Sequence, residues 1–390
     1  MSDSVRRAAQ ASVEAARPSL VALSEVLHAH PETAWEEHRA AGWVGDALAG
    51  AGFRVTPGYL GFDTALLAEA GSGPRVVGLM AEYDALPGLG HACGHNLIAA
   101  SAVGAGIALA GLADDLGLTV RVYGTPAEEG GGGKVEMLDA GAFRDLDLAL
   151  LVHPAPVDVA EARPFAVAHS HIAYAGVSAH AAAYPDRGTN ANDAFLVAQV
   201  ALGLLRQQLP TDTRVHGIQT VGGQAPNAIP ERTEGRWYWR ASTLAELEVL
   251  EERVRRCFEA GALATGASLT ITPESKPYAE FRTDERALAA YRRGAAALGR
   301  TWADPAVAGR MDRASTDMGN VSQVVPAIHP YIGLGTSASN HQREFADACV
   351  GPAAERALVD AAVLMAWTAA EVLSAGRRDG GSQTGQTPYA

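Results

Sequence analysis

Residues 75–96, RVVGLMAEYDALPGLGHACGHN, join a strand-like apolar run to a loop that contains metal-ligand residue types. Cys93 and His95 lie two positions apart in this loop, with Gly94 between them. A thiolate and an imidazole at this spacing can both face one point, and the small glycine lets the backbone come close to it. Cys93 alone could equally be a small buried hydrophobic residue. Together the residues predict a metal site after the strand.

The same pattern of strand and helix continues on both sides of this loop. Because strands alternate with helices, we expect an α/β domain with a mostly parallel sheet and helices on both faces. The expected strands are Arg75–Met80, Leu118–Tyr123, Leu146–Val152 and Ala327–Leu334, and the expected helices include Glu37–Leu48, Leu97–Leu112 and Ala353–Leu373.

The middle of the chain has a different order of elements. The expected strands are His171–Ser178, Arg214–Val221, Thr233–Arg240 and Ser268–Thr272, and the expected helices are Ala191–Gln208 and Leu244–Ala262. The order β-α-β-β-α-β is that of a ferredoxin-like α+β unit. We therefore predict a catalytic domain formed by residues 1–168 and 283–378, an inserted domain at 169–282, and a disordered tail at 379–390.

Further candidate ligands follow the other expected strands. Glu128 and Glu129 come after the second strand, His153 after the third, and His341 after the fourth. Open α/β sheets build their sites at the carboxyl ends of the strands, so we expect these side chains to converge. Five of these groups would hold two divalent ions, and one glutamate would remain as a base for a bridging water. We assign Glu129 as the ligand and Glu128 as the base, although the residues alone allow the reverse.

Composition excludes several other classes of protein. The chain has 390 residues, of which 48% are hydrophobic, and this suits a globular protein of two domains. A formal charge of −13 without a basic cluster argues against nucleic acid as a partner. The longest apolar run, Leu97 to Ala113, is short for a membrane span and is better explained as a buried helix. Three cysteines do not make a disulfide framework, so we expect a cytoplasmic protein.

Several motifs together resemble the M20 family of metallopeptidases. They are GLMAEYDALPGLGHACGHN, TPAEEGGGG, GVSAHAA, APNAIP, STDMGNVS and NHQREFADA, and they span about Val26 to Ala370. The resemblance is strongest to the branch that contains aminoacylases, aminobenzoyl-glutamate hydrolases and β-alanyl dipeptidases. Many relatives have His-x-Asp where this chain has Glu82-Tyr83-Asp84. This difference fits the branch of the family in which a thiolate, here that of Cys93, takes over as metal ligand. A thiolate favours softer ions such as zinc.

The resemblance implies a role for each candidate residue. The metal ligands would be Cys93, His95, Glu129, His153 and His341, with Glu128 as general base and Asp84 as the residue that orients a ligand. The two ions would be zinc or manganese, with cobalt or nickel as alternatives. The inserted domain would act as a lid and form a homodimer.

Further candidates would bind the substrate. His180 would stabilise the oxyanion, in the site of a partner subunit, and Asn227 would bind the substrate carboxylate or the oxyanion. From the residues alone, His180 could be a core histidine and Asn227 a turn residue. Arg313 is a candidate for binding the substrate carboxylate, with Arg240 as the alternative.

We therefore expect an enzyme that hydrolyses the amide bond of a small N-acyl amino acid or a dipeptide. A deacetylase or decarbamoylase of a related amide is an alternative in the same class. A binding protein that kept the fold without the chemistry is the alternative from another class, and the presence of Glu128 argues against it. A membrane partner is not expected.

Overall fold

The computed structural model describes residues 1–304 and 314–374 of the chain. Its larger sheet has six strands in the order β1-β2-β4-β3-β5-β11. The strands are β1 (Arg54–Pro57), β2 (Leu66–Gly71), β3 (Arg75–Glu82), β4 (Leu118–Thr125), β5 (Leu148–Leu150) and β11 (Ala327–Ile328). From β4 to β11 neighbouring strands are parallel, whereas β1 and β2 add an antiparallel edge. The mostly parallel sheet agrees with the expectation, and the β1–β2 edge was not predicted.

Helices cover both faces of this sheet. One face carries α1 (Asp3–Ala29), α2 (His38–Gly50), α3 (His95–Ala110), α8 (Glu285–Ala297) and α12 (Pro352–Ser374). The other face carries α5 (Gly133–Asp139) and α10 (Met318–Ser322). The smaller helices are α4 (Ala113–Leu116) and α11 (Arg343–Ala348), with single turns at Tyr59–Gly61 and Pro185–Arg187. Because both faces are covered, β3 is apolar at consecutive positions: Leu79 packs on one face and Met80 on the other.

The central helix α3 contains mostly alanine and glycine because it is enclosed on nearly all sides. At Gly104 an added Cβ would lie only 2.7 Å from Leu20 and 3.0 Å from Ala362, so glycine allows α1 and α12 to approach closely. α12 is apolar and long enough to span a membrane, but most of it is buried inside the protein. Both apolar helices are therefore core elements.

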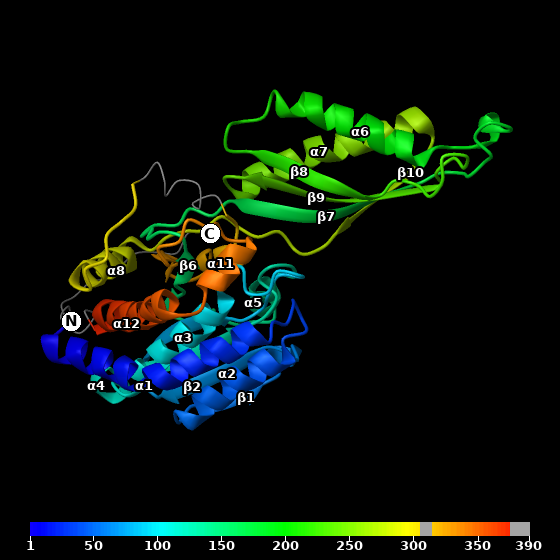
Figure 1. The fold of residues 1–390 in the computed structure, drawn as a ribbon. Helices are drawn as coiled ribbons and strands as arrows, with labels where there is room; N and C mark the ends of the chain where they lie inside the picture. Colours follow the sequence, from blue (N-terminus) through cyan, green and yellow to red (C-terminus); the bar gives the residue numbers. More distant parts are fainter. Residues whose placement is uncertain (305–313, 375–390) are drawn as a thin grey trace.

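A second sheet of four antiparallel strands follows in the order β10-β7-β9-β8. Its elements are β7 (Ala166–Ala175), α6 (Ala191–Arg206), β8 (Arg214–Val221), β9 (Arg232–Ala241), α7 (Leu244–Thr265) and β10 (Ser268–Pro273). Alternate residues such as Ile172 and Trp239 pack against α6 and α7 on one face. The opposite face is turned toward the larger sheet (Figure 1). The element order is the ferredoxin-like order that was expected, and the division at 169 and 282 stays a prediction.

Other differences from the sequence analysis are local. The expected strand Ala327–Leu334 is two strands, because Pro330 has no N–H to continue the ladder: β12 (Tyr331–Gly333) leaves the larger sheet and pairs with β6 (His153–Ala155). α3 begins at His95, two residues earlier than expected. Arg313 and the tail from 379 lie outside the described residues.

Candidate metal site

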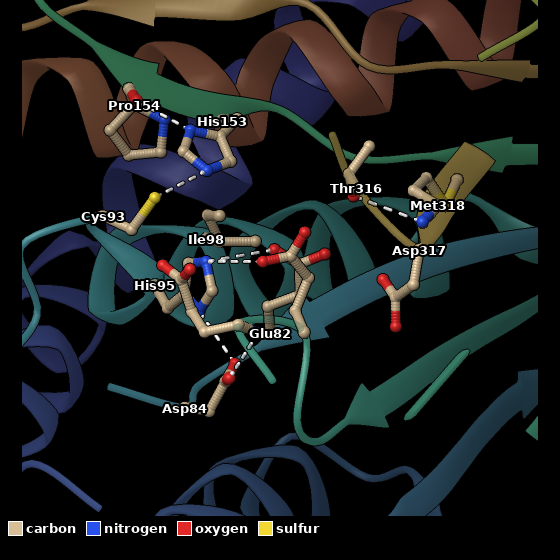
Figure 2. Close-up of polar contacts among 12 residues, drawn as sticks. Glu82, Asp84, Cys93, His95, Ile98, His153, Pro154, Thr316, Asp317 and Met318 are labelled. Atoms are coloured by element: carbon tan, nitrogen blue, oxygen red, sulfur yellow. Dashed lines mark hydrogen bonds and ion pairs between the residues drawn. The ribbon is translucent and has the colours of Figure 1, made fainter. Parts of the chain in front are cut away.

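Four chain segments bring the predicted ligands together beyond the carboxyl ends of the parallel strands. Cys93 lies in the loop after β3, and His95 is the first residue of α3 rather than a loop residue. Glu129 follows β4, His153 begins β6, and His341 precedes α11. Figure 2 shows Cys93 and His153 facing each other above His95. The convergence that the sequence predicted is present.

The donor atoms form two groups that share Cys93. Cys93 Sγ lies 3.5 Å from His153 Nε2 and 3.6 Å from His341 Nε2, and His341 Nε2 lies 3.5 Å from Glu129 Oε1. One group is Cys93, His95 and His153, and the other is Cys93, Glu129 and His341. A further group, His95, Glu128 and Glu129, lacks the thiolate, and in each group the donor atoms lie within 4.8 Å of one another. His95 Nε2 is buried and has no hydrogen-bond partner among the described residues. Thiolate, imidazole and carboxylate donors at these spacings fit two divalent ions.

The surroundings favour the thiolate form of Cys93. Burial and the Glu129 carboxylate raise the pKa of this thiol, whereas His153 and His341 lower it, and the resulting pKa is about 6. The pKa of Glu129 is about 2, because contacts with His341 outweigh the effect of burial. Both groups can therefore be deprotonated at neutral pH, as metal ligands must be.

Asp84 connects two of the candidate ligands. Its Oδ1 lies 2.9 Å from His95 Nδ1, and its Oδ2 accepts a hydrogen bond of 2.9 Å from the backbone N–H of Glu129. If His95 donates its Nδ1 proton to Asp84, its Nε2 keeps a free lone pair for a metal. Asp84 thus lies where a ligand-orienting residue is needed.

A buried charge cluster adjoins Glu128. Glu82, Glu128 and Asp317 have carboxylate oxygens within 4.8 Å of one another. The ammonium of Lys134 lies 2.6 Å from Glu82 and 2.7 Å from Asp317, and all three side chains are completely buried. Burial, together with Glu82 and Glu129, raises the pKa of Glu128 well above its ordinary value. The ammonium of Lys134 therefore neutralises two buried carboxylates that lie next to Glu128, the candidate base.

The backbone of the Glu128–Glu129 loop is strained and held in place. Ala127 has a φ of 57°, which is uncommon for a residue with a side chain. Its N–H donates a 2.8 Å hydrogen bond to the buried carboxylate of Glu37. The hydroxyl of Tyr278 donates a 2.8 Å bond to the carbonyl of Glu128. Strained backbone that the surroundings hold is frequent at functional sites.

A cleft of about 380 Å³ lies between the donor cluster and the second sheet. Its floor includes Glu128, Glu129 and His153, and its roof includes Tyr238 and Arg240 of β9. Arg240 donates a 2.5 Å hydrogen bond to Ser315 Oγ, and no carboxylate of the described residues lies within ion-pair distance of its guanidinium. Arg240 is thus available to an acidic group in the cleft.

Two predicted substrate residues are not in this cleft. His180 and Asn227 are exposed, and their segments pair with each other: Ala181 N donates to Asn227 O at 2.9 Å, and His180 bridges to Ala228. Neither residue lines the cleft. The exposed position of His180 excludes the alternative that it is a core histidine.

Sequence reasoning missed the residues that support the site. Glu37, Lys134, Asp317, Tyr278 and His329 lie on separate segments, and only their contacts reveal them. Lys134 directly follows the quoted motif TPAEEGGGG, and Asp317 lies within STDMGNVS, which was the available signal.

The α/β fold and its cluster of thiolate, imidazole and carboxylate groups define a metal-dependent hydrolase. Residues 78–366 match the family described as Peptidase family M20/M25/M40, and the chain belongs to this family. The resemblance stated from the sequence is confirmed.

Three similar proteins illustrate the relationship. Xaa-Arg dipeptidase of Mus musculus is 41% identical over 383 residues, which cover 94% of this chain and 88% of that protein. One of the polypeptides of the p-aminobenzoyl-glutamate hydrolase of Escherichia coli (strain K12) is 34% identical over 275 residues, 65% of this chain and 57% of that polypeptide. A solved structure of a dinuclear metal-binding peptidase of the M20 family from Bacillus subtilis has a TM-score of 0.69 at 23% identity and covers 92% of this chain and 99% of its own.

Proposed function

We propose that the protein hydrolyses the amide bond of a small N-acyl amino acid or a dipeptide. The position of Glu128 carries the proposal: this carboxylate is 7% exposed, lines the cleft, and lies 3.8 Å from His95 Nε2 within the donor cluster. The modest volume of the cleft, about 380 Å³, suits a small substrate. Relatives named as a dipeptidase and as an aminobenzoyl-glutamate hydrolase support the same class of substrate.

In this proposal Glu128 is the general base and Glu129 the ligand. Glu129 contacts His341, whereas Glu128 lies next to Glu82 and Asp317. Burial, together with Glu82 and Glu129, raises the pKa of Glu128, and a raised pKa strengthens this carboxylate as a proton acceptor that later donates the proton. When bound, the two ions polarise the scissile carbonyl and acidify a water molecule. Glu128 takes the proton of the attacking water and then delivers it to the nitrogen of the leaving amine.

We propose zinc or manganese as the native ions, with cobalt and nickel as alternatives. The thiolate donor of Cys93 and the three imidazoles support the softer of these ions. All three cysteines are free, which is consistent with the proposed cytoplasmic location.

For the substrate we propose that Arg240 binds its carboxylate. A guanidinium without a carboxylate partner matches a carboxylate with two parallel hydrogen bonds. The name of the mouse relative makes dipeptides with a carboxy-terminal arginine the first compounds to examine.

We also propose a homodimer through the second sheet and its helices. Leu196, Val200 and Leu204 of α6 follow one helix face and are 57–63% exposed. β8 is an edge strand of the sheet and exposes Ile218. A second copy that covers this surface would bury the apolar face of α6 and the edge of β8. It would leave His180 and Asn227 free to reach the partner's site.

The test is hydrolysis of a substrate panel by protein reconstituted with zinc or manganese, with a chelated sample as control. The panel contains Xaa-Arg dipeptides and acetyl-, aminobenzoyl-, β-alanyl- and carbamoyl-amino acids. We expect metal-dependent release of a free amino acid from a dipeptide or N-acyl compound. Turnover of acetyl or carbamoyl compounds alone would favour the deacetylase or decarbamoylase, and binding without turnover would favour an inactive homologue.

A further inference from the structure

His329 is a buried histidine with unused hydrogen-bonding capacity. It lies between β11 and β12 and is 3% exposed. Neither of its ring nitrogens has a hydrogen-bond partner among the described residues. A histidine ring always has at least one N–H to donate. Because buried polar groups are nearly always paired, this ring calls for an explanation.

The ring is fixed by aromatic neighbours rather than by polar ones. It stacks on His153 with ring centroids 5.5 Å apart and meets the edges of Tyr331 at 5.5 Å and Phe281 at 5.8 Å. Such contacts hold a ring in one orientation without satisfying its nitrogens. A phenylalanine could make the same contacts, so packing alone does not explain a histidine here.

The position of His329 relates it to the substrate. Its side chain lines the cleft together with Arg240 and Glu128. It is absent from every metal-binding group that the described residues form. Cleft residues that remain unpaired until a ligand arrives are typical of binding sites, where a few placed polar groups fix the orientation of the ligand.

We propose that His329 donates a hydrogen bond to an acceptor oxygen of the bound substrate, and is therefore a substrate-binding residue of the cleft. This inference rests on the proposed hydrolysis of small amides. The acceptor is either the substrate carboxylate, shared with Arg240, or the oxygen of the scissile carbonyl. A neutral donor adds direction to recognition without adding charge.

Three variants separate substrate binding from packing. His329→Phe keeps an aromatic ring and removes the donor, and His329→Gln keeps a donor. Phe281→Leu is the matched packing control, because it alters the neighbour of His329 and removes no polar group. Each variant is measured for bound metal, for Tm without substrate, and for kcat and KM on the best panel substrate.

We expect His329→Phe to keep its metal and a Tm no lower than the wild type, because it removes a buried unpaired group. Its kcat/KM should fall about tenfold to a hundredfold, and His329→Gln should recover part of this loss. Phe281→Leu should lower Tm with little change in kcat/KM. A loss mainly in KM identifies the carboxylate as the acceptor, whereas a loss in kcat identifies the scissile carbonyl.

Binding by calorimetry separates this inference from the proposed function. Dissociation constants for an Xaa-Arg dipeptide are compared between Glu128→Gln protein and the Glu128→Gln/His329→Phe double variant. Weaker binding by the double variant supports His329 even if the wild type hydrolyses nothing. The inference is overturned if the double variant binds within about twofold of its parent, if no panel compound binds, or if Tm and kcat/KM fall together without recovery in His329→Gln.

Discussion

Asp84 Oδ1 lies 2.9 Å from Nδ1 of His95, and both side chains are buried. The same carboxylate holds the backbone of Glu129, so one residue fixes two candidate metal ligands. Carboxylates in this position orient the imidazole and raise its basicity toward a metal.

Replacing Asp84 by asparagine should therefore weaken metal binding. The amide cannot accept the two hydrogen bonds as a charged carboxylate does, and we expect metal affinity to fall about tenfold to a hundredfold. Competition with a chromophoric chelator measures this change. Asp147→Asn is the matched control, because Asp147 also accepts a backbone N–H, that of Val76, on the larger sheet. Equal affinities in the two variants would contradict the orienting role.

Lys134→Met should destabilise the fold. Its ammonium is completely buried between Glu82 and Asp317, and the change would leave two buried carboxylates without their cation. We expect a loss of roughly 3–5 kcal/mol in the free energy of unfolding. Lys276 is the control, because it also contacts two carboxylates, Glu136 and Asp139, but is exposed.

Urea unfolding of both lysine variants measures the difference. Lys276→Met should cost less than about 1 kcal/mol, as exposed ion pairs do. If Lys134→Met is as stable as Lys276→Met, the buried cluster does not depend on its ammonium.

Glu37 predicts a pH dependence of stability. Burial, and then the carboxylate of Asp84, raises its pKa from 4.5 to about 7 in the folded protein. Between these two pH values the unfolded chain loses the proton of Glu37 and the folded protein keeps it. The contribution of this proton to the free energy of unfolding is therefore complete below pH 4.5 and declines as the pH rises to 7. The contribution is roughly 3 kcal/mol.

Glu37→Gln is the matching variant, because glutamine mimics the protonated acid and can still accept the N–H of Ala127. In metal-free protein, the stability of the wild type relative to this variant should fall between pH 4.5 and about pH 7. Urea unfolding at several pH values checks the slope, and parallel curves for the two proteins would contradict it.

The proposed homodimer predicts complementation between two inactive variants. His180 is exposed and does not line the cleft of its own chain, so in the proposal it acts in the site of the partner. A mixture of His180→Ala and Glu128→Gln proteins should therefore regain part of the activity that each lacks. The mixture forms sites with both Glu128 and His180 intact. No recovery after subunit exchange, monitored with labelled subunits, would indicate that His180 does not act across the dimer.

Much of the fold followed from local patterns. β3 was predictable because it is a nearly continuous apolar run, and β4 because it has apolar residues at alternate positions, while the ferredoxin-like order followed from alternating patterns and turns. The break at Pro330 and the β1–β2 edge were missed. Short strands carry little periodic signal, and the proline was read as part of one apolar run.

The site was predictable only in part, for a physical reason. Ligands such as Cys93 and His153 follow strands, so topology brings them to one edge. Supporting groups such as Glu37 and Lys134 act through single contacts with distant segments, and no spacing in the sequence records these contacts. The unpaired ring of His329 likewise becomes evident only from its burial.

The most direct test of the account is the combined measurement of bound metal and kcat in Glu128→Gln protein. This variant should keep the metal content of the wild type, because in the proposal Glu129 and not Glu128 is the ligand. Its kcat should fall at least about a hundredfold, as expected when a general base is lost. Glu136→Gln, on the outer side of α5, should change neither quantity. Turnover by Glu128→Gln near the wild-type rate, or loss of its metal, would contradict the assignment.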